Sequence, residues 1–386
     1  MKRILGNLLV LSLSLTLSVL AAELMARHLV DPIDYLQPAL VTDEFLDFRI
    51  GGHTGAHDAW GFRNQEVPGA ADIVCIGDSM TYGFAARAVD SWPAVLGAMR
   101  GDRVYSMAVP GYGPIQYLQL MRTRALELHP KIVVVGVYLG NDFMDAYNMV
   151  RFNKNWRTYG DIDPSVVQGP PSIVPRDSGP VLAGVRNWLS QRSVLYVMLT
   201  QPLFSALRTR RIMAGAEGDA SYRIAFRDQN HTQIFDFDPR FLFLNVSDSR
   251  IKAGMEITKR ALLDVADVGK RDQIRVVIAL IPTKVRVYGA LVTQAGYLDA
   301  NSRVRGKERL TEALRQEDVV REELAGFLRE QHLEVVDLLP ALSRAVAKGD
   351  LYPLTDPHPD KAGYRVIAET INRYLNDVQS GSKAAT

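Results

Sequence analysis

The sequence has almost no cysteine, since Cys75 is the only one among 386 residues. A single cysteine excludes an internal disulfide, so an apolar core has to hold the fold together. Cys75 stands inside a short apolar run and has no candidate base beside it in the sequence. We therefore expect a small buried hydrophobe at this position and not a nucleophile.

An excess of charge of either sign is also missing. The chain has 45 Lys and Arg against 43 Asp and Glu, a net charge of +2 that does not indicate a nucleic-acid partner. There is no Gly-rich phosphate loop. His53 and His57 lie among glycines, without the cysteine and carboxylate cluster of a metal site. We expect neither a metal nor a cofactor.

Charge is absent altogether from residues 4–22. As a helix this run would be about 28 Å long, close to the hydrocarbon thickness of a bilayer. Lys2 and Arg3 precede it, which predicts a cytoplasmic N-terminus and an exported remainder, periplasmic or extracellular. The segment 1–25 is thus predicted to be a transmembrane anchor. A cleaved signal peptide, which would make the protein secreted, is the alternative, because Val19 and Ala21 fit a cleavage pattern.

Strand and helix patterns alternate over the main domain, residues 71–376. The apolar runs predict strands at 72–77, 103–109, 131–140, 274–281 and 333–338. Amphipathic segments predict helices at 91–100, 114–128, 253–268, about 307–331 and 361–376. This alternation is typical of a flavodoxin-like three-layer α/β/α fold with a parallel five-stranded sheet in the order 2-1-3-4-5.

Three other segments lack the alternation. Residues 26–70 are predicted to form a connector, and residues 377–386 a disordered tail. Residues at about 143–250 are rich in Pro and Gly and predict an insertion with a helix over 185–210, placed as a cap over one end of the sheet. The basic run RTRR at 208–211 is expected on a solvated face.

Chemically useful residues follow four of the predicted strands. Ser79 follows the first strand, Gly111 the second and Asn141 the third, while Asp356 and His358 come after the last. Ligands of open α/β sheets bind beyond the carboxyl ends of the strands, so we expect these residues at one edge. A hydroxyl, an imidazole, a carboxylate, an amide and exposed backbone N–H groups are the components of acyl transfer.

In these motifs the chain resembles the SGNH hydrolases of the GDSL esterase and lipase superfamily. The four blocks of that family match GDSMTYG, AVPGYGP, LGNDF and DPHPDKAGY, in the family's order. The match covers residues 70–142 and about 270–376 and leaves the N-terminal 70 residues and the insertion unexplained. The resemblance implies the α/β fold described above and an esterase activity that needs no cofactor.

The resemblance also implies a role for each matching residue. Ser79 would be the nucleophile, His358 its base, and Asp356 the carboxylate that orients the imidazole. The oxyanion hole would consist of the Ser79 N–H, the Gly111 N–H and the side-chain amide of Asn141. The family usually has two residues between the Asp and the His, and here there is one. A Ser–His dyad without the carboxylate therefore stays open.

Structural roles compete with chemical ones at several of these positions. Ser79 could instead be a helix N-cap, and Asp78 and Asp142 are expected to bond nearby backbone N–H groups. Asp360 is expected to cap the last helix. The segment LIPTKVRVY, 280–288, resembles one found in exported alginate-acetyltransferase-like relatives. Its pattern alone predicts a strand end followed by a loop with a solvated Lys284.

The sequence thus predicts an exported serine esterase that hydrolyses an acyl ester through a Ser79 acyl-enzyme. The expected acyl group is acetyl, and the expected substrate is an extracytoplasmic glycan. One alternative is an O-acyltransferase that moves the acyl group to a polysaccharide hydroxyl, with a membrane-bound partner as donor. Another is a membrane-tethered glycan-binding or assembly protein without catalysis. No pattern identifies substrate-binding residues.

Overall fold

A parallel five-stranded sheet lies at the centre of the computed structural model, which describes residues 2–160, 181–218, 223–236, 244–294 and 304–383. The sheet order is β4-β3-β5-β8-β9, which is the predicted order 2-1-3-4-5. Its strands are β3 (Ile73–Gly77), β4 (Val104–Ala108), β5 (Ile132–Tyr138), β8 (Arg275–Ile281) and β9 (Glu334–Asp337). The predicted fold class and all five predicted strands are confirmed.

The central strands are buried on both faces because helices cover both. Every residue of β3 and of β5 is buried, as expected for β-branched runs inside a parallel sheet. Alternate residues of β3 belong to different apolar clusters: Val74 and Ile76 face one cluster, and Ile73 and Cys75 face the other. The expectation that Cys75 is a buried hydrophobe is therefore confirmed.

The two clusters assign the helices to layers. On the Val74 face lie α4 (Pro114–Leu120), α5 (Asp142–Phe152) and α9 (Ser249–Arg271). On the opposite face lie α3 (Trp92–Arg100), α10 (Lys284–Gln294), α13 (Leu339–Val346) and α14 (Lys361–Lys383). The long helix α12 (Val304–Glu330) contributes to both clusters. The structure is therefore the three-layer arrangement that the alternating pattern predicted.

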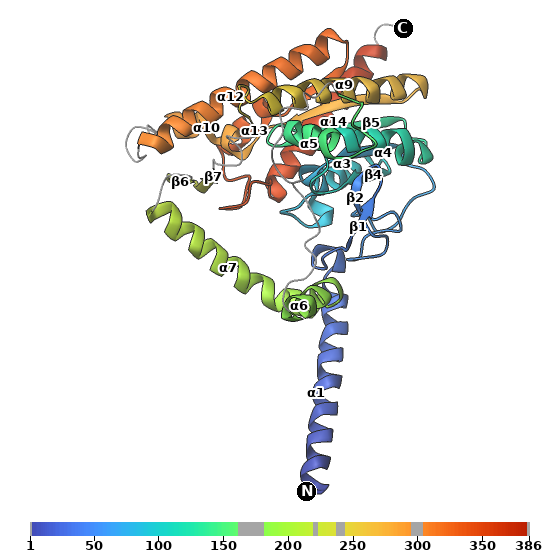
Figure 1. Ribbon diagram of the computed structural model, residues 1–386, viewed down its shortest axis with the longest axis vertical. Coiled ribbons are helices and arrows are strands. Elements are labelled where there is room, and N and C mark those ends of the chain that lie inside the picture. The colour runs from blue at the N-terminus through green and yellow to red at the C-terminus, as the bar shows by residue number, and fades with distance from the viewer. Residues whose placement is uncertain (1, 161–180, 219–222, 237–243, 295–303, 384–386) are drawn as a thin grey trace.

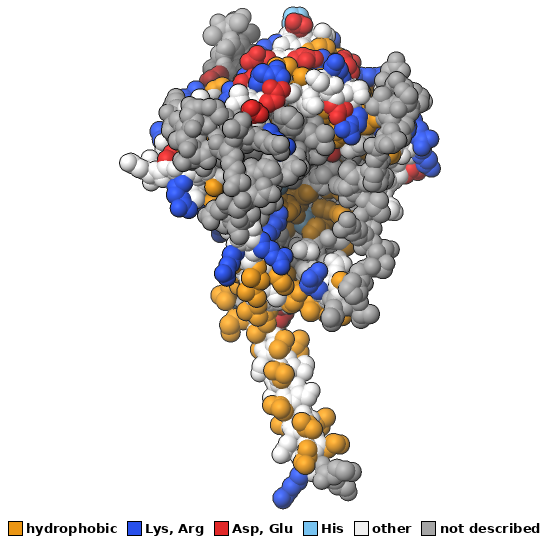
Figure 2. All heavy atoms as spheres, turned by 60° about the vertical axis from the view of Figure 1, so that its left-hand side comes forward, with side chains coloured by type: hydrophobic (Ala, Val, Ile, Leu, Met, Phe, Trp, Pro, Cys, Tyr) orange, Lys and Arg blue, Asp and Glu red, His pale blue; other side chains and the backbone are white. Residues whose placement is uncertain are grey.

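The N-terminal segment consists of a long helix and a small hairpin. Helix α1 (Lys2–Leu29) projects from the domain with apolar side chains along its length (Figures 1 and 2). Among the described residues it is the one helix long and apolar enough to cross a membrane, with a mean hydropathy of 2.1. The predicted connector contains an antiparallel pair, β1 (Leu40–Asp43) and β2 (Asp47–Ile50).

The insertion differs in extent from its prediction. Helix α5 belongs to the core layer, although the predicted insertion included most of it. Further along the chain, α6 (Val181–Arg192) and α7 (Val194–Gly218) form a helical elbow, and β6 (Arg223–Arg227) and β7 (Thr232–Asp236) form a hairpin. The N–H of Ile234 in this hairpin donates to Leu354 O, 2.9 Å away. The hairpin therefore contacts the segment that leads to Asp356.

Two smaller expectations, on the basic run 208–211 and on the C-terminal tail, can be compared with the structure. Arg208, Arg210 and Arg211 are exposed, as predicted for a solvated basic run. At the C-terminus α14 continues to Lys383, whereas the sequence pattern predicted disorder from residue 377. Residues 384–386 and 161–180, which belong to the predicted tail and insertion, lie outside the described residues.

Close packing of α9 on α5 yields a stability prediction. A Cβ on Gly254 of α9 would overlap the carbonyl oxygen of Phe143 in α5, so the two helices can approach only because this residue has no side chain. We expect Gly254→Ala to lower the free energy of unfolding by roughly 1–3 kcal/mol. Thermal unfolding of the full-length chain in detergent measures the change.

The matched control is Gly326→Ala in α12, where a Cβ would meet no atom within 4 Å. There alanine should stabilise by about 0.5–1 kcal/mol, because it favours the helix over the unfolded chain. Equal effects of the two substitutions would contradict the close approach of α9 and α5 as the cause.

Candidate active site

Ser79 lies at the turn between β3 and a one-turn helix, α2 (Ser79–Tyr82). The N-cap of this helix is Asp78, whose carboxylate accepts from the Met80 N–H at 2.9 Å. Asp78 therefore has the backbone-bonding role that was predicted for it, and Ser79 is not the cap. Burial raises the pKa of Asp78 to about 6 against the opposing effect of the Met80 N–H. The Ser79 hydroxyl lies 3.4 Å from Asp78 Oδ2, which is a longer contact than the one it makes with His358.

The hydroxyl of Ser79 meets His358, although the two residues are far apart in the sequence. Its Oγ lies 2.8 Å from His358 Nε2. The other ring nitrogen, Nδ1, lies 2.7 Å from Asp356 Oδ1. The structure thus brings three of the predicted site residues into one chain of hydrogen bonds. An imidazole held between a carboxylate and a hydroxyl can take a proton from that hydroxyl.

The short spacing between Asp356 and His358 does not misalign the carboxylate. Asp356 Oδ1 accepts from the backbone N–H of His358 at 2.8 Å as well as from the ring. A carboxylate that bonds the N–H two residues on forms a local turn, and this turn presents the ring to the same oxygen. One intervening residue is therefore sufficient.

Electrostatics keeps the Asp356 carboxyl ionised. Burial raises its pKa, but the hydrogen bonds and charge of His358 and the charge of Lys284 lower it by more. The net result is a pKa below the ordinary value. At neutral pH Asp356 can therefore accept from Nδ1–H and stabilise the imidazolium.

The three groups predicted for an oxyanion hole follow the three neighbouring strands β3, β4 and β5. Gly77, the last residue of β3, pairs with Ala108, the last residue of β4, and with Gly136 of β5, which continues for two more residues to Tyr138. The three strands therefore end at the same edge of the sheet. The loop after β4 contains Gly111, whose φ of +88° is a conformation that favours glycine. Its N–H donates to no backbone acceptor within the described residues.

Asn141 precedes α5, where an asparagine would ordinarily cap the helix. Its side chain makes no capping hydrogen bond, and its buried Oδ1 has no partner within the described residues. Asp142 has the predicted structural role, because its Oδ2 accepts from the Tyr138 N–H at 3.0 Å. The Asn141 side chain therefore neither caps the helix nor accepts a hydrogen bond at Oδ1 from another described residue.

Lys284 corrects a prediction, because the expected solvated loop lysine is buried. The residue begins helix α10 and is only 2% exposed. Its Nζ donates to the carbonyl oxygens of Pro353 at 2.7 Å, Leu354 at 3.0 Å and Asp356 at 3.3 Å. A strand-end pattern contains no information about these carbonyls, which come from another loop. The buried ammonium holds the segment that bears Asp356 and His358.

A buried carboxyl supports the same region. Glu317 of α12 accepts from the Thr283 N–H at 2.8 Å and from the Thr283 hydroxyl at 2.5 Å. Burial raises the pKa of Glu317 to about 7, and the two bonds from Thr283 oppose the rise. The residue before Lys284 is thereby tied to α12.

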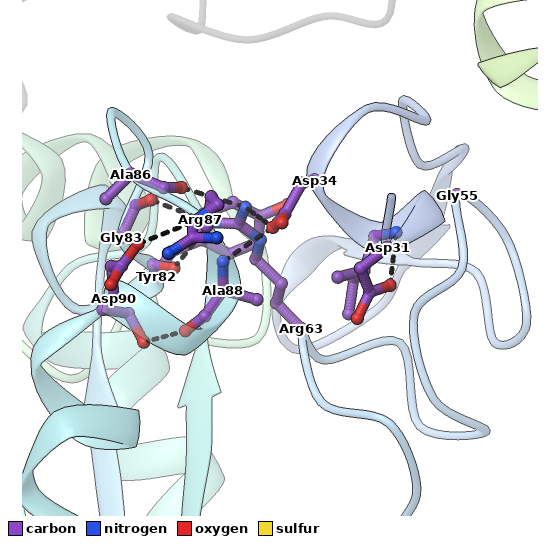
Figure 3. A network of polar contacts seen from close by, with 12 residues as sticks. Asp31, Asp34, Gly55, Arg63, Tyr82, Gly83, Ala86, Arg87, Ala88 and Asp90 are labelled. Carbon is purple, nitrogen blue, oxygen red and sulfur yellow. Dashed lines mark hydrogen bonds and ion pairs between the residues drawn. The ribbon is translucent and has the colours of Figure 1, made fainter. Parts of the chain in front are cut away.

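On the other side of Ser79, Arg63 holds the turn that follows α2 (Figure 3). Its guanidinium donates to the carbonyl oxygens of Gly83 at 2.7 Å, Ala86 at 3.1 Å and Tyr82 at 3.3 Å. It also pairs with Asp34 at 2.9 Å. No signal in the sequence pointed to Arg63. The segment next to α1 is therefore part of the support of the Ser79 turn.

Two aromatic contacts complete the surroundings of Ser79. The phenol of Tyr82 bonds His57 Nε2 at 2.8 Å, and burial lowers the pKa of His57 to about 4. Because Nδ1 faces the carbonyl of Gly55, the neutral ring donates there and accepts from Tyr82. The exposed ring of Phe84 lies 5.0 Å from the His358 ring, centroid to centroid.

At the C-terminal end of the site loop, Asp360 has its predicted capping role. Its carboxylate accepts from the N–H groups of Ala362 at 2.8 Å and Gly363 at 3.1 Å. The turn that contains His358 is thus joined directly to the start of α14.

Comparison with known proteins gives matches only among solved structures. No protein-family model and no curated protein matches the sequence. An extracellular lipase from Streptomyces rimosus is 12% identical with a TM-score of 0.40, over 79% of this chain and 100% of the lipase. A lipolytic protein of the G-D-S-L family from Desulfitobacterium hafniense is 14% identical with a TM-score of 0.37, over 78% of this chain and 98% of that one.

A third match is an acetylxylan esterase from Geobacillus stearothermophilus, solved as a catalytic mutant. It is 9% identical, with a TM-score of 0.38, over 80% of this chain and 95% of the esterase. Similarity at this level does not assign a function, so the assignment has to come from the residues of the site itself.

The raised pKa of Glu317 predicts how stability depends on pH. Between pH 4.5, the ordinary value, and about 7, the folded state keeps a proton that the unfolded state releases. The free energy of unfolding should therefore fall as pH rises through this window, by roughly 1–3 kcal/mol for this group. Glu317→Gln should remove that part of the fall and raise the melting temperature at pH 7.5 relative to the native chain.

Thermal unfolding of both proteins at pH 4.5, 6 and 7.5 measures the difference. Glu330→Gln, at an exposed position of the same helix, is the matched control and should leave the pH profile unchanged. A Glu317→Gln profile parallel to that of the native chain would contradict the assignment.

Proposed function

We propose that this protein is a serine esterase of the SGNH type, with Ser79 as nucleophile, His358 as general base and Asp356 as the carboxylate that orients the imidazole. The observation that carries the proposal is the continuous chain of hydrogen bonds from Ser79 Oγ through His358 to Asp356 Oδ1. The N–H groups of Ser79 and Gly111 and the side-chain amide of Asn141 would stabilise the oxyanion.

In the proposed reaction the Ser79 oxygen attacks the ester carbonyl carbon while His358 Nε2 takes the hydroxyl proton. The tetrahedral intermediate then expels the alcohol oxygen, which receives this proton from His358. Water, activated by the same imidazole, attacks the acyl-enzyme. The products are the carboxylic acid and the free Ser79 hydroxyl, so the site returns to its starting state.

A short acyl ester on a glycan outside the cytoplasm is the proposed substrate. The uncharged run 4–22 of helix α1, which follows Lys2 and Arg3, supports a membrane-anchored domain on the outer side, periplasmic or extracellular. Phe84, exposed beside His358, would offer a flat apolar surface on which a sugar ring or an acyl group can pack.

The first experiment tests the nucleophile. It uses the chain with its N-terminal part, so that Asp34 is retained, and detergent keeps the apolar helix α1 in solution. We expect hydrolysis of p-nitrophenyl acetate and a loss of at least about 10³-fold in kcat/KM for Ser79→Ala. A fluorophosphonate should form one adduct, on the peptide that contains Ser79, located by mass spectrometry. An active chain whose adduct lies on another serine would refute the assignment.

A second experiment tests Lys284 as a positioning residue. Lys284→Met removes the donor that binds three carbonyl oxygens of the segment before His358, so the imidazole should lose its alignment. We expect kcat on p-nitrophenyl acetate to fall about 10- to 100-fold with little change in KM, since alignment affects the transition state more than binding.

The matched control for this experiment is Lys348→Met, an exposed lysine in the same C-terminal region. Melting temperatures of both variants separate misalignment from unfolding. A kcat of the folded Lys284→Met variant within about twofold of the native value would show that alignment does not depend on this ammonium.

A further inference from the structure

The elbow formed by α6 and α7 exposes large apolar side chains. Trp188 of α6 is 55% exposed and Leu199 of α7 is 68% exposed. The other large apolar residues of the elbow with more than half of their surface exposed are Val185, Leu203, Phe204 and Leu207. An apolar surface of this extent, left uncovered by the described part of the chain, indicates an interaction site.

The elbow lies where the apolar stretch of α1 ends. Glu23 is the first charged residue after the uncharged run, and its carboxylate binds the start of α7. It accepts from the N–H groups of Val194 and Leu195, each at 3.0 Å, and from the Ser193 hydroxyl at 2.8 Å. If α1 spans a bilayer, Glu23 marks the outer surface, so these contacts place the α6–α7 junction at that surface.

A small apolar cluster makes this junction firm. Ala26 of α1, Leu36 of the connector and Val194 of α7 are buried together. Arg27 of α1 adds a hydrogen bond to the Arg192 carbonyl oxygen. In Figure 1 the elbow adjoins the end of α1, and Figure 2 shows hydrophobic side chains gathered there with Lys and Arg side chains directly above.

The amino-acid composition of the elbow is typical of segments that lie in the headgroup region of a bilayer. The elbow, residues 181–218, contains five arginines and one acidic residue, Glu217, which lies at the far end of α7 from the junction. The guanidinium of Arg192 lies 5.5 Å from the Trp188 ring centroid, which pairs an aromatic with a cation at one position. Tryptophan is enriched at membrane–water interfaces, and arginine pairs with lipid phosphates. A protein partner would not require this excess of one charge.

We propose that the α6–α7 elbow docks on the outer surface of the same bilayer that α1 spans, with Val185, Trp188 and Leu199 in the headgroup region. The proposal rests on the membrane anchor in the proposed function and not on the esterase activity. From the elbow α7 leads to the β6–β7 hairpin, which bonds Leu354 near the site. Docking would therefore set the position of the candidate site relative to the membrane.

Cys75 makes the test direct, because it is fully buried and a nitroxide label would react only with an introduced cysteine. The full-length chain would be labelled at Trp188→Cys or Leu199→Cys and reconstituted into bilayers of phosphatidylcholine and phosphatidylglycerol. Gln331→Cys, exposed in the main domain, is the water control. Leu11→Cys in α1 reports whether the anchor itself lies in the bilayer.

Docking predicts that oxygen, which concentrates in lipid, relaxes the labels at 188 and 199 more than a water-soluble nickel complex does. The ratio of the two accessibilities should exceed that at 331 by at least about fivefold. The proposal would be overturned if the labels at 188 and 199 were as accessible to the nickel complex as the label at 331. It would also be overturned if protein shielded these labels from both oxygen and nickel. Because Leu11→Cys tests the anchor and the ester assay tests catalysis, failure of docking is distinguishable from either.

Discussion

Parallel strand pairing is the constraint on which the candidate site depends. Since β3 pairs in parallel with β4 on one side and with β5 on the other, all three strands end at the same edge of the sheet, with β5 two residues longer. The loops after them bear Ser79, Gly111 and Asn141. A sheet of this kind needs no long-range signal in the sequence to bring such residues together, because the chain direction alone places them at one edge.

That constraint explains why so much could be predicted. The strands were recognisable because double-sided burial demands unbroken β-branched runs, as in β5. Ser79, Asp356 and His358 were recognisable as candidates because their sequence blocks resemble those of the SGNH hydrolases and occur in the same order. The pattern left open whether one residue between the acid and the histidine allows alignment. Backbone geometry answers this, since one oxygen of Asp356 accepts from two N–H groups of His358.

The errors arise where the partners of a side chain are backbone atoms of a distant loop. Lys284 was expected in solvent because a lysine after a strand is usually exposed. Its three partners are backbone carbonyl groups, which every residue has, so the sequence pattern could not indicate them. Arg63 was missed for the same reason. The predicted insertion, from about residue 143, includes most of α5, which packs in the core and whose polar residues weaken its apolar pattern.

Lys284 and Arg63 also share a physical logic. Irregular loops cannot satisfy their carbonyl groups within a helix or a sheet, yet the loops on both sides of Ser79 lie partly buried. A buried cation with several donors can satisfy three carbonyl oxygens at once. Lys284 does so for the loop that precedes His358. Arg63 does so for the turn that follows Ser79. Each loop is thereby held by a side chain other than Ser79, Asp356 and His358. Because Asp34 pairs with Arg63, one of these supports begins only a few residues beyond α1, so the segment that follows α1 is part of the framework of the candidate site.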